Sequence, residues 1–225
     1  MNELPEHDGE PVAGLPEELP AGESIVWQGS PEWRNLAFSG LHMRKIAIYF
    51  LLIFVMRQWL LMEEQAGLVE NLQSGMWFAI LASLVVALLG ISAWLIARST
   101  LYTITTRRIV MRFGVALPMT INLPFSQLEA AGIRRRANGN GDIPLLPVAG
   151  NRLSYVVLWP HVRPLQLSRV QPMLRAIPDV EEVAERLATA LSRFATEEGA
   201  PATTKAALPA VKEQQSWSMA RAGQH

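Results

Sequence analysis

Two long apolar runs lie in the first half of the chain, and each predicts a membrane-spanning helix. Residues 76–97 are twenty-two residues without a charge. At a rise of about 1.5 Å per residue, such a helix is about 33 Å long, enough to cross a hydrocarbon core of about 30 Å. Residues 45–62 form a second apolar run, which Arg57 and Gln58 interrupt. We predict a two-helix transmembrane hairpin over residues 45–97. The alternatives are a buried core helix for residues 76–97 and an in-plane or re-entrant helix for residues 45–62.

Arg57 is a candidate for a contact inside the membrane. An arginine at the bilayer centre costs about 2.5–3.5 kcal/mol on insertion scales. Arg57 lies near the end of its run, so its long stem could reach the interface. It could instead face a helix of a partner subunit, because ionisable groups inside membranes usually serve a function.

The charges that flank the two runs predict their orientation. The loop between the runs carries acidic residues and no basic ones, whereas basic residues precede the first run and follow the second. The positive-inside rule therefore places both termini in the cytoplasm. The basic residues are Arg34, Arg44, Lys45, Arg98, Arg107 and Arg108, and the acidic ones are Glu63, Glu64 and Glu70.

Beyond the second run, short segments with the polar and apolar pattern of β-strands follow one another closely. The Asn-Gly pairs within residues 138–142 are a strong signal for a β-hairpin. Close spacing and local turns favour an antiparallel sandwich or small barrel. The predicted strands are residues 100–105, 108–115, 118–123, 128–136, 143–148, 152–159 and, as a less regular last member, 165–168.

One amphipathic helix is predicted after the strands. It begins near Pro178, has three acids in its first turn, and carries one apolar stripe formed by Val180, Val183, Ala184, Leu187, Leu191 and Phe194. The expected organisation is an acidic disordered arm (1–24), a membrane-proximal segment (25–44), the hairpin (45–97), an antiparallel α+β domain (98–196) and a disordered tail (197–225).

Charge and composition exclude several kinds of chemistry. Residues 1–33 hold eight acids and no basic residue, whereas residues 98–196 hold thirteen arginines against six acids. The chain has no cysteine, and its four histidines are scattered, none inside either apolar run. We therefore expect no thiol chemistry, no metal or other cofactor, and no histidine ligand for a membrane pigment. No nucleophile–base pair or phosphate-binding glycine motif is present. The chain is not expected to be an enzyme or to bind nucleic acid.

Five residues of the α+β domain are candidate contacts for a partner or for lipid. Arg134, Arg135 and Arg136 form the densest basic run, either a solvated strand end or a contact for anionic lipid or protein. Beside the Asn-Gly turn their burial is not expected. Trp159 is either a core residue or a partner anchor. His161 lies between two prolines, which favours a surface or packing role over a pigment or metal ligand.

Several short motifs of the chain resemble motifs of known protein families. "YTITTRRIVMR" (102–112) resembles the strand pair that opens bacterial pleckstrin-homology-like (PH-like) domains after membrane hairpins. A wider pattern resembles the PuhB family of photosynthetic-complex assembly proteins of purple bacteria, over about residues 18–194. This pattern comprises "ESIVWQGSPEWRNLA" (23–37), "GDIPLLPVAG" (141–150), "LWPHVRP" (158–164) and "PMLRAIPD" (172–179).

The resemblance implies a function that the residues alone do not. It implies a PH-like domain and a membrane-anchored factor for assembling the reaction centre with light-harvesting 1, in the bacterial inner (intracytoplasmic) membrane. The implied partners are subunits of those complexes and membrane lipids. A homo-oligomer of this chain is a further possibility. The alternative is a lipid-sensing or envelope-stress protein of the same architecture.

Overall fold

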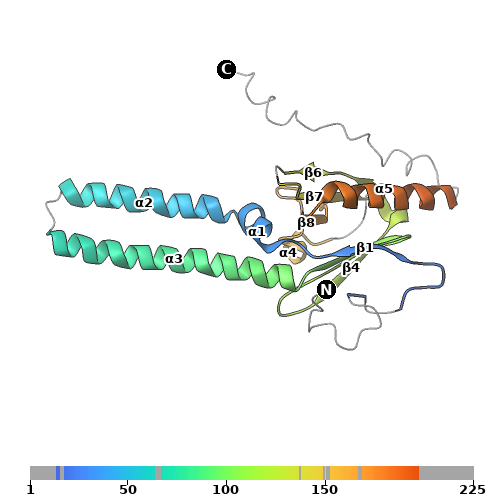
Figure 1. Ribbon diagram of the computed structural model, residues 1–225, viewed down its shortest axis with the longest axis horizontal. Coiled ribbons are helices and arrows are strands. Elements are labelled where there is room, and N and C mark those ends of the chain that lie inside the picture. The colour runs from blue at the N-terminus through green and yellow to red at the C-terminus, as the bar shows by residue number, and fades with distance from the viewer. Residues whose placement is uncertain are drawn as a thin grey trace, which may run out of the picture.

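The computed structural model describes residues 14–15, 18–63, 67–136, 138–148, 150, 153–166 and 169–197. Two long helices extend away from a domain of two sheets and one long covering helix (Figure 1). We predicted disorder for the arm (1–24) and the tail (197–225), and most of these residues lie outside the described ones. Within the described part of the arm, Glu23 pairs with Arg108 at 2.8 Å, so an acid of the arm does contact the basic domain.

The two long helices are α2 (Met43–Glu63) and α3 (Leu68–Arg98), which lie side by side (Figure 1). Phe50 and Phe54 of α2 pack on Phe78 of α3, with ring centroids 6.2 and 6.0 Å apart. Both helices are longer than the predicted runs, because polar residues at their ends also adopt helical conformation.

Only part of the predicted membrane hairpin meets the length and hydropathy that a span requires. Among the described helices, Asn71–Arg98 alone is long and apolar enough to cross a membrane. The stretch Met43–Leu61 reaches this level only when joined to Trp33–Gly40, from which it is bent by 55°. Met43–Leu61 is apolar on average, but it contains three charged residues, Arg44, Lys45 and Arg57.

The membrane-proximal segment contributes a strand that we did not predict. It contains β1 (Ile25–Gly29), α1 (Trp33–Asn35) and the π-helical turn η2 (Leu36–Gly40). β1 pairs antiparallel with β2, which lies on the far side of both long helices in the sequence. The domain is therefore formed from both sides of the helical pair, and the boundary predicted at residue 98 is wrong. A pairing between strands so far apart in sequence leaves no local signal.

The first sheet has the order β1-β2-β3-β4 and confirms the first three predicted strands. These are β2 (Leu101–Thr105), β3 (Arg108–Phe113) and β4 (Met119–Pro124), each antiparallel to the next. Gly114, with φ of +121°, opens the turn between β3 and β4, where a Cβ atom would collide with the carbonyl oxygen of Leu117.

The second sheet has the order β5-β7-β6, and β8 also pairs with β7. The predicted strand 128–136 forms two strands, β5 and β6, separated by Gly132 and Ile133. The predicted Asn-Gly hairpin is confirmed, because it joins β6 to β7. β8 was not predicted, since Arg175 interrupts its apolar pattern. The elements are the 3-10 turn η3 (Phe125–Gln127), β5 (Leu128–Ala131), β6 (Arg134–Arg135), β7 (Gly141–Pro147) and β8 (Met173–Ile177).

The predicted strand 152–159 is wrong. Its described part contains a single helical turn, α4 (Tyr155–Leu158), which begins after Ser154 and ends before Trp159. The β-branched pair Val156 and Val157 favours a strand, but only Leu158 of this turn is fully buried. Of the last predicted strand, residues 167–168 lie outside the described residues, and 165–166 are not in a strand.

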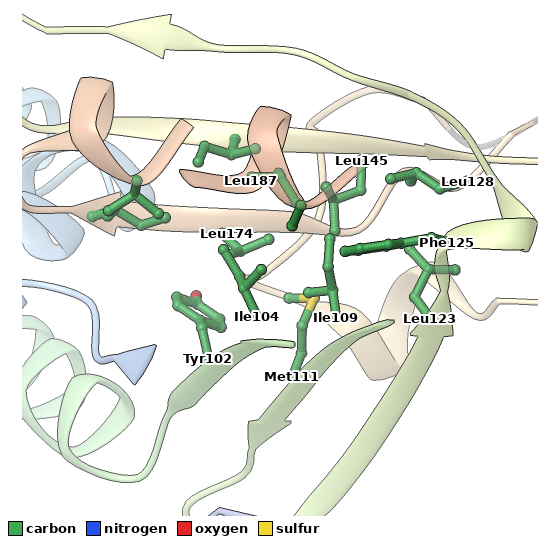
Figure 2. Close-up of a cluster of buried hydrophobic side chains, with 14 of the residues drawn as sticks. Tyr102, Ile104, Ile109, Met111, Leu123, Phe125, Leu128, Leu145, Leu174 and Leu187 are labelled. Carbon is green, nitrogen blue, oxygen red and sulfur yellow. The ribbon is translucent and has the colours of Figure 1, made fainter. Parts of the chain in front are cut away.

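The core lies between the two sheets and under α5 (Val180–Glu197), the predicted amphipathic helix. Figure 2 shows Tyr102, Ile104 and Met111 of the first sheet directed toward Leu145 and Leu174 of the second, with Leu187 of α5 above them. The stripe of α5 is buried as predicted, apart from Ala184, which is half-buried. Its fully buried members are Val180, Val183, Leu187, Ala190, Leu191 and Phe194.

Candidate interaction surface and the polar cluster beneath it

The basic run Arg134–Arg136 is divided between the surface and the interior. Arg134 and Arg135 are exposed on β6, and Arg135 pairs with Glu181 of α5 at 2.6 Å, an ion pair open to water on both sides. Arg136 turns inward and pairs with Asp142, whose side chain is fully buried. The expectation that none of the three is buried is therefore wrong for Arg136. Within this run, Arg134 and Arg135 are the exposed members.

His161 is 1% exposed, so it does not offer the surface contact for which it was a candidate. It belongs to a chain of hydrogen bonds that runs from β8 to the last turn of α3. The Arg175 backbone N–H donates to the Tyr102 hydroxyl at 3.3 Å, and that hydroxyl lies 2.6 Å from His161 Nδ1. On the other side of the ring, Nε2 lies 3.2 Å from Thr100 Oγ1, which donates to the Ile96 carbonyl at 2.7 Å.

The directions of these bonds fix the tautomer of His161. Because the Thr100 hydroxyl proton is given to Ile96, His161 Nε2 must donate to Thr100. Nδ1 is then the acceptor, and Tyr102 donates to it. Burial, and secondarily the charge of Arg175, lower the pKa of His161 to about 3. Burial likewise raises the pKa of Tyr102 above its ordinary value. Both groups are neutral in the folded domain.

Arg175 forms the second half of this polar cluster. It is 6% exposed, and burial lowers the pKa of its guanidinium, an effect that the nearby carboxylate of Asp142 opposes. Asp142 also accepts a hydrogen bond of 3.0 Å from the backbone N–H of Ala176. Asp142 thus ties β7 to β8 and lies beside two arginines, Arg136 and Arg175.

The membrane-proximal segment is attached to the same cluster. The Glu32 backbone N–H donates to the Ala176 carbonyl at 2.8 Å, and its carboxylate accepts from the Asn140 side chain at 2.6 Å. A Cβ atom at Gly40 would lie 3.2 Å from a guanidinium nitrogen of Arg175. The cluster therefore joins both entry points of the helical pair, residues 30–40 and the end of α3, to β8. We did not predict the roles of Asp142 and Arg175, although both lie in motifs quoted above, because the partners that bury them lie far along the chain.

The remaining candidates lie at the surface or on α2. Trp159 is 55% exposed at the end of α4, so its role as a contact stays a prediction and its alternative as a core residue is wrong. Arg57 is half-buried on α2 and donates to the Gln58 side chain at 3.3 Å. Its intramembrane contact also stays a prediction. Within the described residues, no group of three or more histidines and carboxylates is placed to hold a metal ion.

Comparison with known proteins assigns the architecture. The model of the family described as "Bacterial PH domain" matches residues 47–191, more than half of the chain. The chain belongs to the bacterial PH domain family. The matched region includes most of α2 and all of α3 as well as the strands from β2 onward. The predicted PH-like domain is confirmed by this match.

One similar protein adds genomic context. A Rhodobacter capsulatus protein, described as an uncharacterized 23.7 kDa protein in the puhA 5′ region, is 35% identical over 200 residues. The match covers 88% of this chain and 94% of that protein. No solved structure matches the chain significantly.

Proposed function

We propose that this bacterial PH domain protein is a membrane-anchored assembly factor of the PuhB type. It would assist formation of the photosynthetic reaction centre and light-harvesting 1 core complex by binding, without catalysing a reaction. The observation that carries the proposal is the relative named for the puhA 5′ region, a name that points to a photosynthetic gene cluster. The motifs that resemble the PuhB family support the same assignment.

Membrane anchorage is supported by where the apolar side chains of α3 lie. A core helix of a soluble protein is mostly buried. In the most apolar 18-residue stretch of α3, only 6% is buried. Leu81, Leu84 and Leu88 are each more than half exposed. Unpaired apolar surface of this extent is costly in water and favourable in lipid. We propose that α3 spans the inner (intracytoplasmic) membrane and that α2 is a second span, with both termini in the cytoplasm.

The two parts would have separate roles. The exposed faces of α2 and α3 would lie beside helices of nascent reaction-centre and light-harvesting subunits, and Arg57 would supply a polar contact there. In the cytoplasm, Arg134 and Arg135 form an exposed basic pair that suits an acidic patch on a partner. Opposite charges of this kind steer association and fix its orientation.

A deletion strain of a photosynthetic host tests the assembly role. We expect the absorption of the core complex to fall while pigment synthesis continues, and the wild-type gene to restore it. Accumulation of an early pigment precursor with normal assembly would instead indicate an enzyme. An intact core complex with a changed response to lipid composition would favour the lipid-sensing alternative.

Complementation of that strain tests the basic pair. The double variant Arg134→Glu/Arg135→Glu should restore less core complex than wild type, because it reverses the charge of the docking surface. The matched control Arg186→Glu/Arg193→Glu changes two exposed arginines of α5 and should restore it fully. Both variants alter exposed residues, so their circular dichroism should equal that of wild type. Equal restoration by the two would contradict a docking role for Arg134 and Arg135.

A further inference from the structure

Two neighbouring segments of the PH domain expose apolar side chains although the domain has a complete core. They are the turn after β3 with the start of β4 (residues 114–119) and the short helix α4 with Trp159. Leu117 is 79% exposed and Val156 is 82% exposed. Outside residues 33–98, nine large apolar side chains of the described chain are exposed, and six of them lie in these two segments: Val115, Leu117, Met119, Val156, Val157 and Trp159.

These two segments, here called the collar patch, meet at the end of α3. A cavity of about 230 Å³ is lined together by Ile96 and Ser99 at the end of α3, Val115 and Met119 of one segment, and Trp159 of the other. Figure 1 shows α4 and the turn before β4 on the side of the domain where α3 enters it. The collar patch is therefore continuous with the apolar surface of α3.

The length of α3 sets the level of the collar patch relative to a bilayer. Asn71–Arg98 comprises 28 residues, about 42 Å of helix at about 1.5 Å per residue, which exceeds a hydrocarbon core of about 30 Å. If α3 spans the membrane as proposed, this excess length allows its last turn to lie among the lipid headgroups, and the residues there suit that position. The Arg98 guanidinium lies 5.5 Å from the ring of Trp94, which is 45% exposed, and tryptophan and arginine are typical of this zone.

The chemistry of the collar patch suits a lipid surface better than a charged protein partner. Residues 113–119 and 153–162 contain no acidic residue, no lysine and no arginine. Their only titratable groups are Tyr155, for which water is accessible, and His161, which is buried and neutral. Leucine, valine and tryptophan side chains enter the boundary between headgroups and acyl chains without having to leave a charge unsolvated.

We propose that the collar patch inserts into the cytoplasmic interface of the same bilayer that α3 crosses, through Leu117, Val156 and Trp159. The PH domain then has a second attachment beside its covalent one. A single helix would allow the domain to swing about the end of α3, whereas two attachments hold it in one orientation at the membrane surface. This inference rests on the proposed membrane anchorage.

The absence of native cysteine permits a direct depth measurement on the full chain. Single cysteines at Leu117 and Val156 would carry an environment-sensitive fluorophore in proteoliposomes of phosphatidylcholine and phosphatidylglycerol. A fraction of the lipid would bear a quenching nitroxide near the headgroup end of the acyl chain. Insertion to a depth of about 5–10 Å should quench about half of the fluorescence at both positions. A fluorophore at Thr189, exposed on α5, should keep its fluorescence.

A fluorophore at Leu84 in the middle of α3 separates this inference from the anchorage. Shielding from aqueous quencher at Leu84 together with nitroxide quenching at Leu117 and Val156 would support the inference. Shielding at Leu84 without quenching at the other two positions would overturn it and leave the anchorage intact. Exposure of Leu84 to aqueous quencher would overturn both.

Discussion

α3 and α5 are both rich in leucine, alanine and valine, but their apolar side chains lie in opposite environments. α5 is amphipathic, and its apolar stripe is covered by the two sheets. Among the residues of α3 whose burial is described, only Gly75, Ala93 and Ala97 are buried. Buried polar residues are found in the PH domain, where Asp142, Arg175 and the neutral His161 are enclosed. The difference shows that the domain covers its own apolar side chains, whereas the described chain leaves those of α3 uncovered, and this contrast is the basis of the proposed membrane span.

The largest effect should come from removing the buried carboxylate of the domain. Asp142→Ala leaves Arg136 and Arg175 without their shared counter-charge and the Ala176 N–H without its acceptor. Removing one partner of a buried ion pair costs about 3–5 kcal/mol. We expect a loss of this size in chemical unfolding of the full chain in detergent.

The neighbouring surface pair provides the matched control for Asp142→Ala. Glu181→Ala removes the exposed partner of Arg135, and such pairs contribute about 0–1 kcal/mol. Similar stability for the two variants would show that the polar cluster does not hold the domain together.

A charge placed in the middle of α3 should have the next largest effect. Leu84→Lys puts an ammonium group at the centre of the proposed span, where insertion costs about 2.5–3.5 kcal/mol. We expect much less protein to resist alkaline extraction from membranes. The same change at Thr189, exposed near the middle of α5, should leave membrane association and stability within about 0.5 kcal/mol of wild type. Unchanged extraction of the Leu84 variant would show that α3 lies in water or within a protein assembly.

Elements with a local pattern could be predicted from the sequence. The apolar run of α3, the stripe of α5 and the Asn-Gly turn before Asp142 each carry their own signal. β1 and β8 could not be predicted, because β1 pairs with a strand beyond the helical pair and β8 contains a buried arginine. The turn Tyr155–Leu158 was predicted as a strand because β-branched residues dominate it.

The candidate site could be predicted less well, because its buried polar residues are defined by partners that are distant in the sequence. Arg134, Arg135 and Arg136 are identical in type, and only tertiary structure shows that the third faces a buried carboxylate. His161 resembles a loop residue in the sequence, yet its ring is enclosed by Tyr102, Thr100 and Phe113. Burial of a polar residue depends on its partners, and those lie far along the chain.

Measured over a single pH unit, the smallest effect concerns acid, and it follows from the neutral state of His161. Burial lowers the pKa of His161 from 6.5 to about 3. An unfolded chain takes up this proton near pH 6.5, but the folded chain does not until about pH 3. The stabilisation is therefore complete above pH 6.5 and is lost as the pH falls from 6.5 toward 3. The loss is about 1.4 kcal/mol for each pH unit.

His161→Asn removes the titrating ring, so its free energy of unfolding should fall less steeply over this interval than that of wild type. His42→Asn is the matched control, because His42 is exposed and its positive φ of 57° suits asparagine. Carboxylates titrate alike in all three proteins, so the difference in slope, measured by chemical unfolding at several pH values, isolates His161. Equal slopes for wild type and His161→Asn would mean that the ring is protonated in the folded domain, and the hydrogen-bond directions assigned to Tyr102 and Thr100 would then be wrong.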